Sequence, residues 1–490
     1  MPAIITSKFR THNAAQFLES FSEAAPNVYY LGIGRPQEFT TETRPDGRTD
    51  YLGTDSLPQT PADNESAEIY AYDDLMSVKR IDSSNVSFVI PRRNWTSGTI
   101  YDYYRHDYNS YQTGSTSTKE TSTSGATVLS DATFYVLTAA RNVYKCLDNN
   151  NGGTSTVEPT GTSTSILTTG DGYKWKYMYT LTAAQQVNFL SPDFMAVATD
   201  STVSSAAVNG SVDVVKIKNA GSGGTNGTHT NIPIRGDGSG GVVTVVVASG
   251  AIDSVTVTSP GTGYTAAYIR LADINAAGAV GLITAELDCI ISPKGGHGFN
   301  AVDELNGFFV MLNQSLEGTE QTNSGDYTVD QDFRRIVLMR DPKSGGSAAT
   351  STTLRATKAV RFASSPTPGT FTADEKITQA STGAVGKVVE WDATNRILYY
   401  IQTRHNDSGA DSNGNVTAFS GANVITGADS GATGTPSATA SETADQITFT
   451  NGYASPELDH DSGEVLYMEN RAPITRTADQ TENVKLIIEF

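Results

Sequence analysis

Short runs of apolar residues with a period of two most strongly constrain how this 490-residue chain can fold. The clearest run places Tyr173, Trp175, Tyr177, Tyr179 and Leu181 at every second position, which is typical of a half-buried strand. Clusters of Gly, Ser and Thr separate such runs, and the sequence contains 45 glycines. This pattern predicts a mainly β fold, with an α+β core of few helices and a multidomain β-sandwich or barrel architecture.

Two segments favour helices instead. Residues 13–21 place apolar side chains at helical spacing after Asn13, which is a candidate N-terminal cap. A weaker pattern at residues 66–79 predicts a second helix that Ser66 would cap. We expect the first helix to contact a core through one apolar stripe.

Polar stretches separate the predicted strands of the N-terminal half. Val86, Phe88 and Ile90 alternate with other residues and predict a further half-buried strand. Residues 111–124 and 149–169 consist largely of Ser, Thr, Gly and Asn, so they bury too little apolar area to offset their ordering entropy. We expect both to be long surface loops.

The length of the chain predicts two to four domains, because one hydrophobic core rarely serves 490 residues. Composition divides the chain further, since two regions are rich in small and β-branched residues. Within the first of these, Pro260 and Gly261 predict a tight turn. The expected segments are a core part at 1–204, an all-β Gly/Val-rich insert at 205–286, a second core part at 287–365, an all-β insert at 366–444, and a closing core part at 445–490.

The second insert contains an internal repeat. At a constant offset of 48 residues, Phe371 corresponds to Phe419, and residues 377–386 correspond to residues 425–434. Two copies are too few for a solenoid, so a small β-sandwich or barrel with pseudo-symmetric edges is predicted. Strand candidates at 387–391 and 397–401 lie between the copies.

Charge and cysteine content exclude several classes of partner. The chain carries 53 acidic and 34 basic side chains, and the net charge of −19 repels phosphate backbones, so no nucleic-acid partner is predicted. No apolar run reaches the about 18 residues that cross a bilayer, so no membrane partner is predicted either. We expect Cys146 and Cys289 to be reduced and buried in a protein assembled in cytoplasm, without a secretory signal.

No motif supports catalysis, a cofactor or a metal. Residues 236–241 fit G-x-G-x-x-G by letter, but a valine-rich strand follows instead of a helix, which favours a turn. The six histidines and two cysteines lack zinc-ligand spacing. An oxygen-rich loop lacks the order of a calcium site and favours a solvated turn; it contains Asp407, Asp411, Asn413 and Asn415. A glycosidase pair among the 53 carboxylates stays an open alternative, because distance in space is not visible in sequence.

Four tyrosines gather at residues 101–108. Tyrosine rings can stack on sugars or bases, yet they are also typical of protein interfaces. In an acidic chain without a basic groove, this cluster favours an interface or a core position.

The C-terminal segment at 460–474, with 479–482 and the strand-like residues 484–490, resembles the baseplate wedge family encoded by gene eight of T4-like contractile-tailed phages. Further segments resemble that family in the same order, and they lie at 7–11, 90–95, 143–148, 170–175 and, more weakly, 333–336. The resemblance covers about 1–200, 287–365 and 445–490. Both inserts lie outside it.

This resemblance implies a structural, non-enzymatic virion subunit of the tail baseplate, assembled in the host cytoplasm. It implies a homodimer within a hetero-oligomeric wedge that contacts other wedge proteins and transmits rearrangement on host contact. Planar guanidinium groups suit carboxylates, and Tyr and Met offer apolar area. The candidate structural or interface residues are therefore Arg92, Arg93, Trp95, Tyr467, Met468, Glu469, Asn470 and Arg471.

Three questions stay open at this point. An arginine paired with Glu464 or Glu469 inside the core is an alternative to an inter-subunit role. A carbohydrate-binding or depolymerising tail protein is the alternative function, because the inserts could bind sugar, decorate the surface or replace contacts made by another wedge protein. We also expect residues 460–490 to return to the core formed by residues 7–181, with residues 484–490 adding a closing strand.

Overall fold

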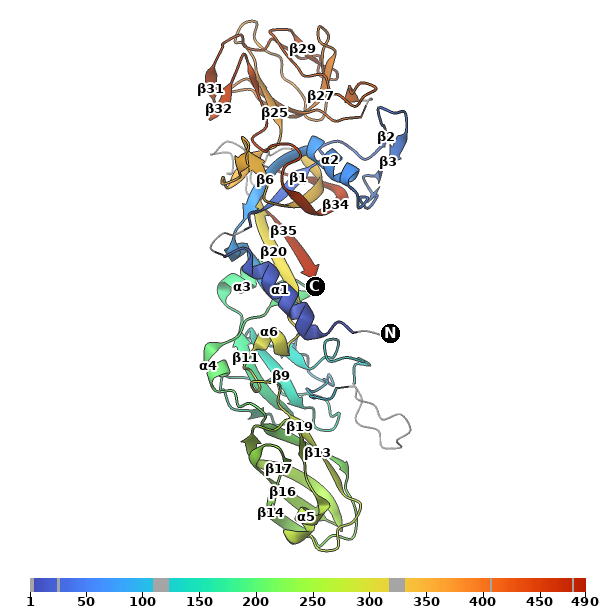
Figure 1. Ribbon diagram of the computed structural model, residues 1–490, viewed down its shortest axis with the longest axis vertical. Helices are drawn as coiled ribbons and strands as arrows, with labels where there is room; N and C mark the ends of the chain where they lie inside the picture. The colour runs from blue at the N-terminus through green and yellow to red at the C-terminus, as the bar shows by residue number, and fades with distance from the viewer. Residues whose placement is uncertain (1–3, 24–26, 109–122, 317–330, 406–407, 478–479) are drawn as a thin grey trace. The chain divides into compact units, whose positions relative to one another are not determined.

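The computed structural model describes residues 4–490 except 24–26, 109–122, 317–330, 406–407 and 478–479 (Figure 1). Antiparallel strands dominate the described chain, so the predicted mainly β class is confirmed. The chain forms two compact units. Unit 1 comprises Met1–Leu18, Ser87–Met311 and Ile487–Phe490, and unit 2 comprises Glu19–Val86 and Leu312–Leu486.

Unit 1 is built around an antiparallel sheet in the order β10-β11-β9-β8. Its strands are β8 (Tyr135–Leu137), β9 (Asn142–Asp148), β10 (Leu167–Thr168) and β11 (Lys174–Thr180). A second sheet, β12-β7-β20-β35, contains β7 (Val86–Pro91), β12 (Phe194–Ala196), β20 (Phe309–Leu316) and β35 (Glu482–Glu489). Short helices in this unit are α3 (Ala183–Phe189), α4 (Ser201–Ser205) and α6 (Ala301–Glu304).

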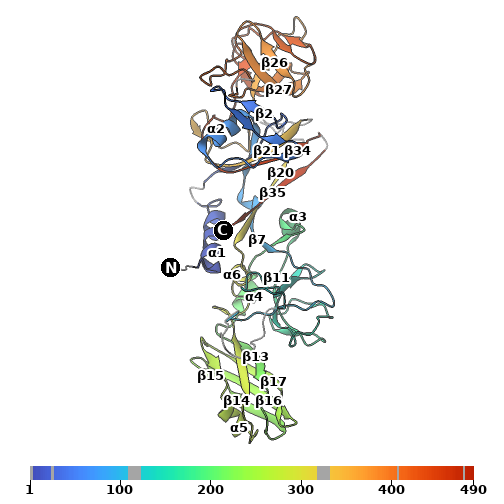
Figure 2. The ribbon, with the colours of Figure 1, turned by 90° about the vertical axis from the view of Figure 1, so that its right-hand side faces the viewer.

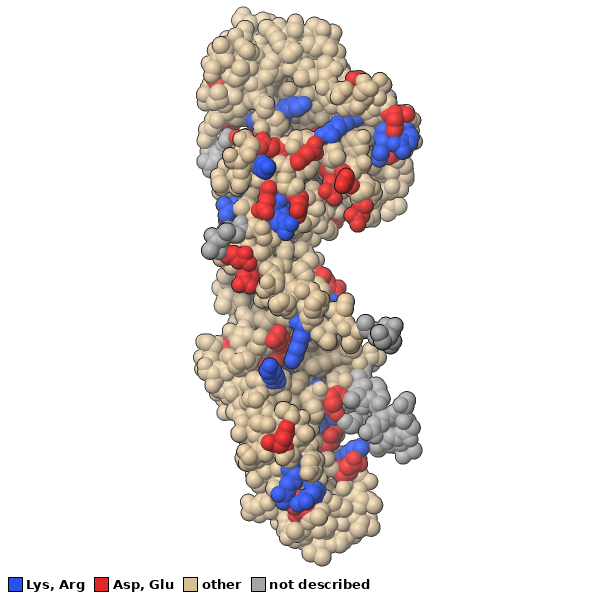
Figure 3. Space-filling view, in the orientation of Figure 1, with Lys and Arg blue, Asp and Glu red and all other residues tan. Residues whose placement is uncertain are grey.

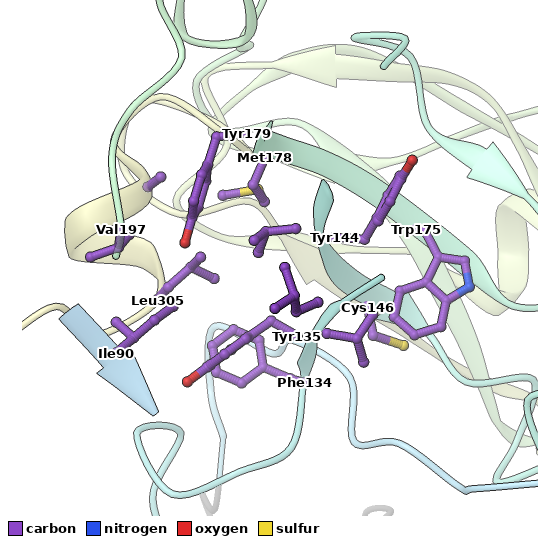
Figure 4. Close-up of a cluster of buried hydrophobic side chains, with 14 of the residues drawn as sticks. Ile90, Phe134, Tyr135, Tyr144, Cys146, Trp175, Met178, Tyr179, Val197 and Leu305 are labelled. Carbon is purple, nitrogen blue, oxygen red and sulfur yellow. The ribbon is translucent and has the colours of Figure 1, made fainter. Parts of the chain in front are cut away.

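Strand β11 lies in the centre of the unit 1 core, and Figure 4 shows Trp175, Met178 and Tyr179 among the buried side chains. The five residues that predicted this strand are all buried. The expectation of a half-buried strand was wrong, however, because Lys176 and Met178 on the opposite face are also buried. The Lys176 ammonium donates to a backbone carbonyl oxygen, which compensates its burial.

The tyrosine cluster at residues 101–108 belongs to the same core. Tyr101, Tyr103 and Tyr104 are each at most 5% exposed. The ring of Tyr101 meets Trp175 edge-on with 5.8 Å between centroids. These rings are therefore core residues, and they are not accessible to sugars or bases. Cys146 is a buried free thiol in this core, and Cys289 is a buried free thiol as well, as expected.

The N-terminal helix α1 spans Ser7–Glu19, so its predicted start at Asn13 was wrong. Thr6 stands before the first turn, and its Oγ1 accepts a hydrogen bond from the Phe9 amide. This hydroxyl satisfies an amide that has no partner within the helix, which is the role that was assigned to Asn13. The helix buries Thr11 and Ala14.

The last residues of the chain return to unit 1. The Phe490 amide donates to the carbonyl oxygen of Phe308 at 3.1 Å, and the Phe490 ring lies 5.4 Å from that of Phe17 in α1. Arg10 donates to the Phe490 carbonyl oxygen and lies over the Phe308 ring. Residues 487–490 thus join the unit that contains β7, β9 and β11, whereas residues 460–475 belong to unit 2 and depart from that expectation.

The first predicted insert has its own buried cluster, with Val212, Val245, Ile274 and Ile291 among its members. Its elements are β13 (Val212–Asn219), β14 (Gly227–Pro233), β15 (Arg235–Gly236), β16 (Ser239–Ala248), β17 (Ala251–Thr262), β18 (Ala267–Tyr268), α5 (Leu271–Ala276) and β19 (Glu286–Ile291) (Figure 2). Because β19 pairs with β13, this sheet extends past residue 286. The predicted boundaries themselves stay a prediction.

Two turn predictions in this region had different outcomes. Within residues 236–241, Asp237 and Gly238 connect β15 to β16, which agrees with the predicted turn. The turn predicted at Pro260 was wrong, because β17 continues to Thr262 and Pro260 pairs with Gly241. Strand β17 is an edge strand, where a residue without an amide proton is tolerated.

Unit 2 contains a five-stranded antiparallel sheet in the order β24-β6-β1-β21-β34. Its strands are β1 (Tyr29–Gly34), β6 (Leu75–Ile81), β21 (Asp332–Arg340), β24 (Thr353–Arg355) and β34 (Glu464–Thr475). Short hairpins accompany it, namely β2 (Thr41–Thr43) with β3 (Thr49–Tyr51), β4 (Gly53–Thr54) with β5 (Leu57–Pro58), and β22 (Lys343–Ser344) with β23 (Ser347–Ala348).

The second predicted helix was only half right. Helix α2 spans Glu65–Asp73, a 3₁₀ turn occupies Ser83–Asn85, and the residues between them form β6. The cap is Asn64 instead of Ser66, because Asn64 Oδ1 accepts from the Ala67 amide at 3.0 Å. Strand β6 pairs with both β1 and β24, so tertiary hydrogen bonding overrides the helical spacing there.

The second insert forms a seven-stranded sheet in the order β30-β29-β26-β27-β28-β25-β33. Its strands are β25 (Lys358–Arg361), β26 (Lys376–Gln379), β27 (Ala384–Asp392), β28 (Ile397–Ile401), β29 (Ile425–Gly427), β30 (Thr433–Gly434) and β33 (Tyr453–Ala454), beside the hairpin of β31 (Glu442–Ala444) and β32 (Ile447–Phe449). The strand candidates at 387–391 and 397–401 are confirmed.

The internal repeat corresponds to a local two-fold relation. Strands β26 and β29 pair antiparallel, and Thr378 lies opposite Thr426, its equivalent at the offset of 48 residues. Each strand continues into a hairpin at a glycine of positive φ, Gly383 at 77° and Gly431 at 64°. The two copies therefore stabilise each other by pairing along their own symmetry axis.

Of the two predicted surface loops, the one at 111–124 lies outside the described residues except for its last two. Both of these bind Asp102, which is 2% exposed and accepts hydrogen bonds from Thr123, Ser124 and Thr133. Burial raises the pKa of Asp102, but these hydrogen bonds lower it further, so the group titrates below its usual value. Most of residues 149–169 is exposed or half-buried, as expected, although Asn149 and Ser155 are buried.

Removing residues 484–490 should prevent soluble folding of unit 1. The deletion removes the backbone and ring contacts of Phe490, the partly buried Ile487, and most of β35, and it exposes the apolar surface that they cover. Thermal unfolding and solubility of the truncated chain measure this effect. Asn483→Ala, at an exposed position of the same strand, is the control. A truncated protein with the control's melting temperature would disprove the closing role of residues 484–490.

Acid should destabilise unit 1 through His297. Burial, and then Lys145 and Lys176, hold the pKa of His297 well below its ordinary 6.5. The unfolded chain therefore takes up a proton near pH 6.5 that the folded unit rejects, so the free energy of unfolding falls as the pH drops below that value.

Thermal unfolding at about pH 7.5 and about pH 5 tests this expectation. The fall in melting temperature should be smaller in His297→Gln than in the wild type, because the variant has no imidazole to protonate. An equal fall in both proteins would contradict the assignment to His297.

Candidate assembly surface

Strand β34 lies at an edge of the unit 2 sheet and pairs with β21 alone in its ladder (Figure 1). All of its residues are half-buried or exposed, in contrast to those of β1, which are all buried. An edge strand presents backbone N–H and C=O groups that can pair with another chain. Five of the eight predicted interface residues, 467–471, lie on this strand.

Tyr467 and Glu469 lie on one side of β34, opposite Leu338 and Ile336 of β21, and Arg471 follows where the register of the ladder shifts. The Tyr467 hydroxyl donates to Glu469 Oε2 at 2.8 Å. Burial, and then this carboxylate, raise the pKa of Tyr467 to about 12. Arg471 forms no ion pair within the part of the chain that the structure describes, so its guanidinium is available to an external carboxylate.

The other side of β34 faces inward. Met468 packs against the buried cluster of unit 2. Asn470 Oδ1 accepts from Arg335 Nε at 2.9 Å, and Asn470 Nδ2 donates to the Gln59 carbonyl oxygen at 3.0 Å. Both side chains thus have partners in their own unit, which favours a structural role for them over an interface role.

Behind Asn470 lies a buried ionic network of Arg35, Glu42, Asp74 and Arg335, which we call the Asp74 network. Arg335 Nη1 donates to both oxygens of Asp74, at 2.9 and 3.0 Å. Arg35 lies 3.4 Å from the same carboxylate and donates to Glu42 Oε1 at 2.8 Å. All four residues are at most 9% exposed.

The Asp74 network is electrically balanced, with two guanidinium groups facing two carboxylates. Burial raises the pKa of Asp74, and Arg335 and Arg35 oppose that rise. The network reaches the second insert through His405, whose Nδ1 lies 3.1 Å from Glu42. A cavity of about 260 Å³ opens beside it, lined in part by Arg335, His405 and Met468. Because each charge has a partner, the arrangement is suited to holding elements together.

The remaining predicted interface residues belong to unit 1 and also bind their own chain. Arg92 donates to a backbone carbonyl oxygen at 2.9 Å. Arg93 donates to two backbone carbonyl oxygens, and its guanidinium lies over the ring of Tyr135. Trp95 Nε1 donates to Ser155 Oγ at 3.0 Å. The interface assignment of the eight residues stays a prediction, and Tyr467, Glu469 and Arg471 support it best.

Neither glutamate considered as a core partner binds Arg92, Arg93 or Arg471. Glu464 forms an exposed pair with Arg340, and Glu469 accepts from Tyr467. Sequence reasoning missed Arg35, Glu42 and Asp74 altogether. The one available signal was Arg334 and Arg335 together inside an apolar strand, since buried arginines require acidic partners.

Within the described residues, no cluster of three or more His, Cys, Asp or Glu side chains could hold a metal ion. In the same part of the chain, every helix is too short or too polar to cross a membrane. Asp411, from the oxygen-rich loop, accepts from the amides of Asn413 and Asn415 at 2.8 Å each, and Asp407 lies outside the described residues. These bonds form an ordinary turn.

Comparisons with known proteins connect the chain to one family. The family model described as "Bacteriophage T4, Gp8" matches residues 435–490, which include β34 and β35. Baseplate wedge protein gp8 of Enterobacteria phage T4 is 22% identical over 222 residues, covering 40% of this chain and 60% of the T4 protein. The chain is similar to the Gp8 family over residues 435–490. The resemblance expected from the sequence is thereby confirmed.

The Gp8 match coincides with the elements that close both units. Its residues include the edge strand β34 of unit 2 and the Phe490 contacts of unit 1. Because the alignment spans less than two thirds of T4 gp8, the role of that whole protein comes to this chain only as a proposal.

Replacing Arg335 by Met should destabilise unit 2 by about 3–5 kcal/mol, because Asp74 would keep a buried charge without its bidentate partner. Arg340→Met on the same strand is the matched control, since its pair with Glu464 is exposed and contributes at most about 1 kcal/mol. Denaturant unfolding measures both values. Equal effects of the two substitutions would contradict a stabilising role of the Asp74 network.

Proposed function

We propose that this chain is a structural, non-enzymatic subunit of a phage tail baseplate wedge. The observation that carries the proposal is the Gp8 relationship at residues 435–490 together with the position of β34, within those residues, at a sheet edge. An edge strand with half-exposed side chains gives a neighbouring subunit both backbone hydrogen-bonding groups and specific side-chain contacts.

The finer features of the proposal follow from the same relationship. We propose that the protein is a homodimer inside a hetero-oligomeric wedge, that it is part of a contractile tail assembled in the host cytoplasm, and that it links neighbouring wedge proteins. Rearrangement on host contact would pass through it, because buried ionic and aromatic networks make each unit move as a body instead of deforming gradually.

The alternative of a carbohydrate-binding or depolymerising tail protein loses one of the two observations that supported it. It drew on the tyrosine cluster at residues 101–108, and the rings of Tyr101, Tyr103 and Tyr104 are buried in the unit 1 core. The inserts, its other motive, are compatible with decoration, with protein contacts and with sugar binding.

Reversing the charge of Arg471 should weaken assembly without weakening the fold. Arg471→Glu places a carboxylate where a partner's carboxylate is expected, so self-association or incorporation into purified baseplates should fall at least about tenfold. Analytical ultracentrifugation measures the first, and quantitative electrophoresis of purified tails measures the second. The melting temperature should not change, because Arg471 has no ion pair in the described chain.

Lys294→Glu, an exposed charge reversal in unit 1, is the control and should assemble normally. Normal assembly of Arg471→Glu would remove Arg471 from the interface. A wild-type chain that is strictly monomeric and absent from purified baseplates would overturn the proposed function itself.

A further inference from the structure

A polar cleft of about 630 Å³ lies in unit 2 between helix α2 and the second insert. Its walls include Lys358 from β25, Tyr400, Arg404, Asn413 and Asn415 from the second insert, and His460 from the C-terminal segment. Figure 3 shows Lys or Arg side chains in a hollow on the face that carries α2. The volume falls in the range of small-ligand sites in proteins, about 300–1,000 Å³.

The charges at one end of the cleft compensate each other. His460 places Nε2 2.9 Å from Asp73 Oδ1 and Nδ1 2.9 Å from Asp461 Oδ1. Arg404 lies 3.2 Å from Asp73 and 3.3 Å from Asp461. Arg404 Nη2 also lies 3.0 Å from Nδ1 of His460, so the side chains at this end of the cleft bind one another.

Lys358 is the exception among the basic groups of the cleft. Its ammonium donates to Gln402 Oε1 at 2.8 Å, a neutral acceptor, and no carboxylate of the described chain lies within ion-pair distance. Gln402 is itself fixed, because its amide donates to the carbonyl oxygens of Val385 and Thr417 at 2.8 and 2.9 Å. The lysine is thus held in place by a neutral side chain instead of a direct ion pair.

Burial lowers the pKa of Lys358, and Asp73 opposes that shift only in part. A half-buried ammonium without a counter-ion is costly, and a bound anion would remove that cost. Asn413 and Asn415 are exposed at the rim, where an amide can bind hydroxyl groups. A ligand that matches the cleft therefore has one anionic group and several hydroxyls.

We propose that this cleft binds an acidic saccharide unit. Its carboxylate would pair with Lys358, and its hydroxyls would bind the amides of Asn413 and Asn415. This activity goes beyond the proposed wedge role, and it gives the second insert a function of its own. The site requires no catalysis.

Calorimetric titration of the full chain with glucuronate, glucose and inorganic phosphate tests the proposal. Glucuronate and glucose share a ring and differ by the carboxylate, so glucuronate should bind at least about tenfold more tightly. Phosphate supplies charge without the ring hydroxyls and should bind more weakly than glucuronate. Equal binding of glucose and glucuronate, tighter binding of phosphate, or no binding of glucuronate would each overturn the proposal.

Lys358→Gln should reduce glucuronate affinity at least about tenfold, and Asn413→Ala should reduce it a few-fold. Lys376→Gln, an exposed lysine of β26 outside the cleft, should bind as the wild type does. If Lys358→Gln fails to fold, the exposed Asn413→Ala variant decides the question. Unchanged affinity in the folded variants would overturn the site while leaving the proposed wedge function intact.

Discussion

The carboxylate of Asp74 is the interaction on which the organisation of unit 2 depends. It receives both hydrogen bonds from one guanidinium nitrogen of Arg335 and attracts Arg35, so it joins the start of β6 to β1 and β21. Arg335 continues to Asn470 in β34, and Glu42 continues to His405 in the second insert. A buried charge is tolerated only where such partners surround it, so these elements must be positioned together. The edge strand with the candidate assembly residues is thereby fixed from behind.

In unit 1, aromatic packing holds the elements together. Tyr173 and Trp175 stack with 5.4 Å between centroids, and Tyr101 meets both rings edge-on. Its buried ion pair, Lys145 with Glu304, places the ammonium beneath the ring of Tyr104. The C-terminal residues close this unit through Phe490, while β34 closes the other. The stretch of sequence that is similar to Gp8 therefore contributes to both units.

Local patterns in the sequence predicted where strands lie, but they did not predict which residues cover those strands or where helices begin. The period of two located β7 and β11, but it could not show that β11 is covered on both faces, because the covering residues come from distant segments. Helix ends failed for a related reason: Thr6 and Asn64 cap α1 and α2, whereas the apolar spacing pointed to Asn13 and Ser66. The repeat at an offset of 48 residues was visible, yet the pairing of its two copies through Thr378 and Thr426 depends on their contact in space.

For the candidate assembly surface, too, the sequence located the residues, and the structure was needed to show their contacts. Resemblance located residues 467–471, and the alternation of a strand then separates Tyr467 and Glu469 from Met468 and Asn470. Only the tertiary structure reveals that Asn470 is occupied by Arg335 and Gln59, whereas Arg471 has no ion pair in the described chain. A side chain whose hydrogen bonds are already made within its own unit contributes little binding free energy to a contact with a partner. Met468 and Asn470 therefore hold β34 on its own unit, and they set how rigidly Tyr467, Glu469 and Arg471 are presented.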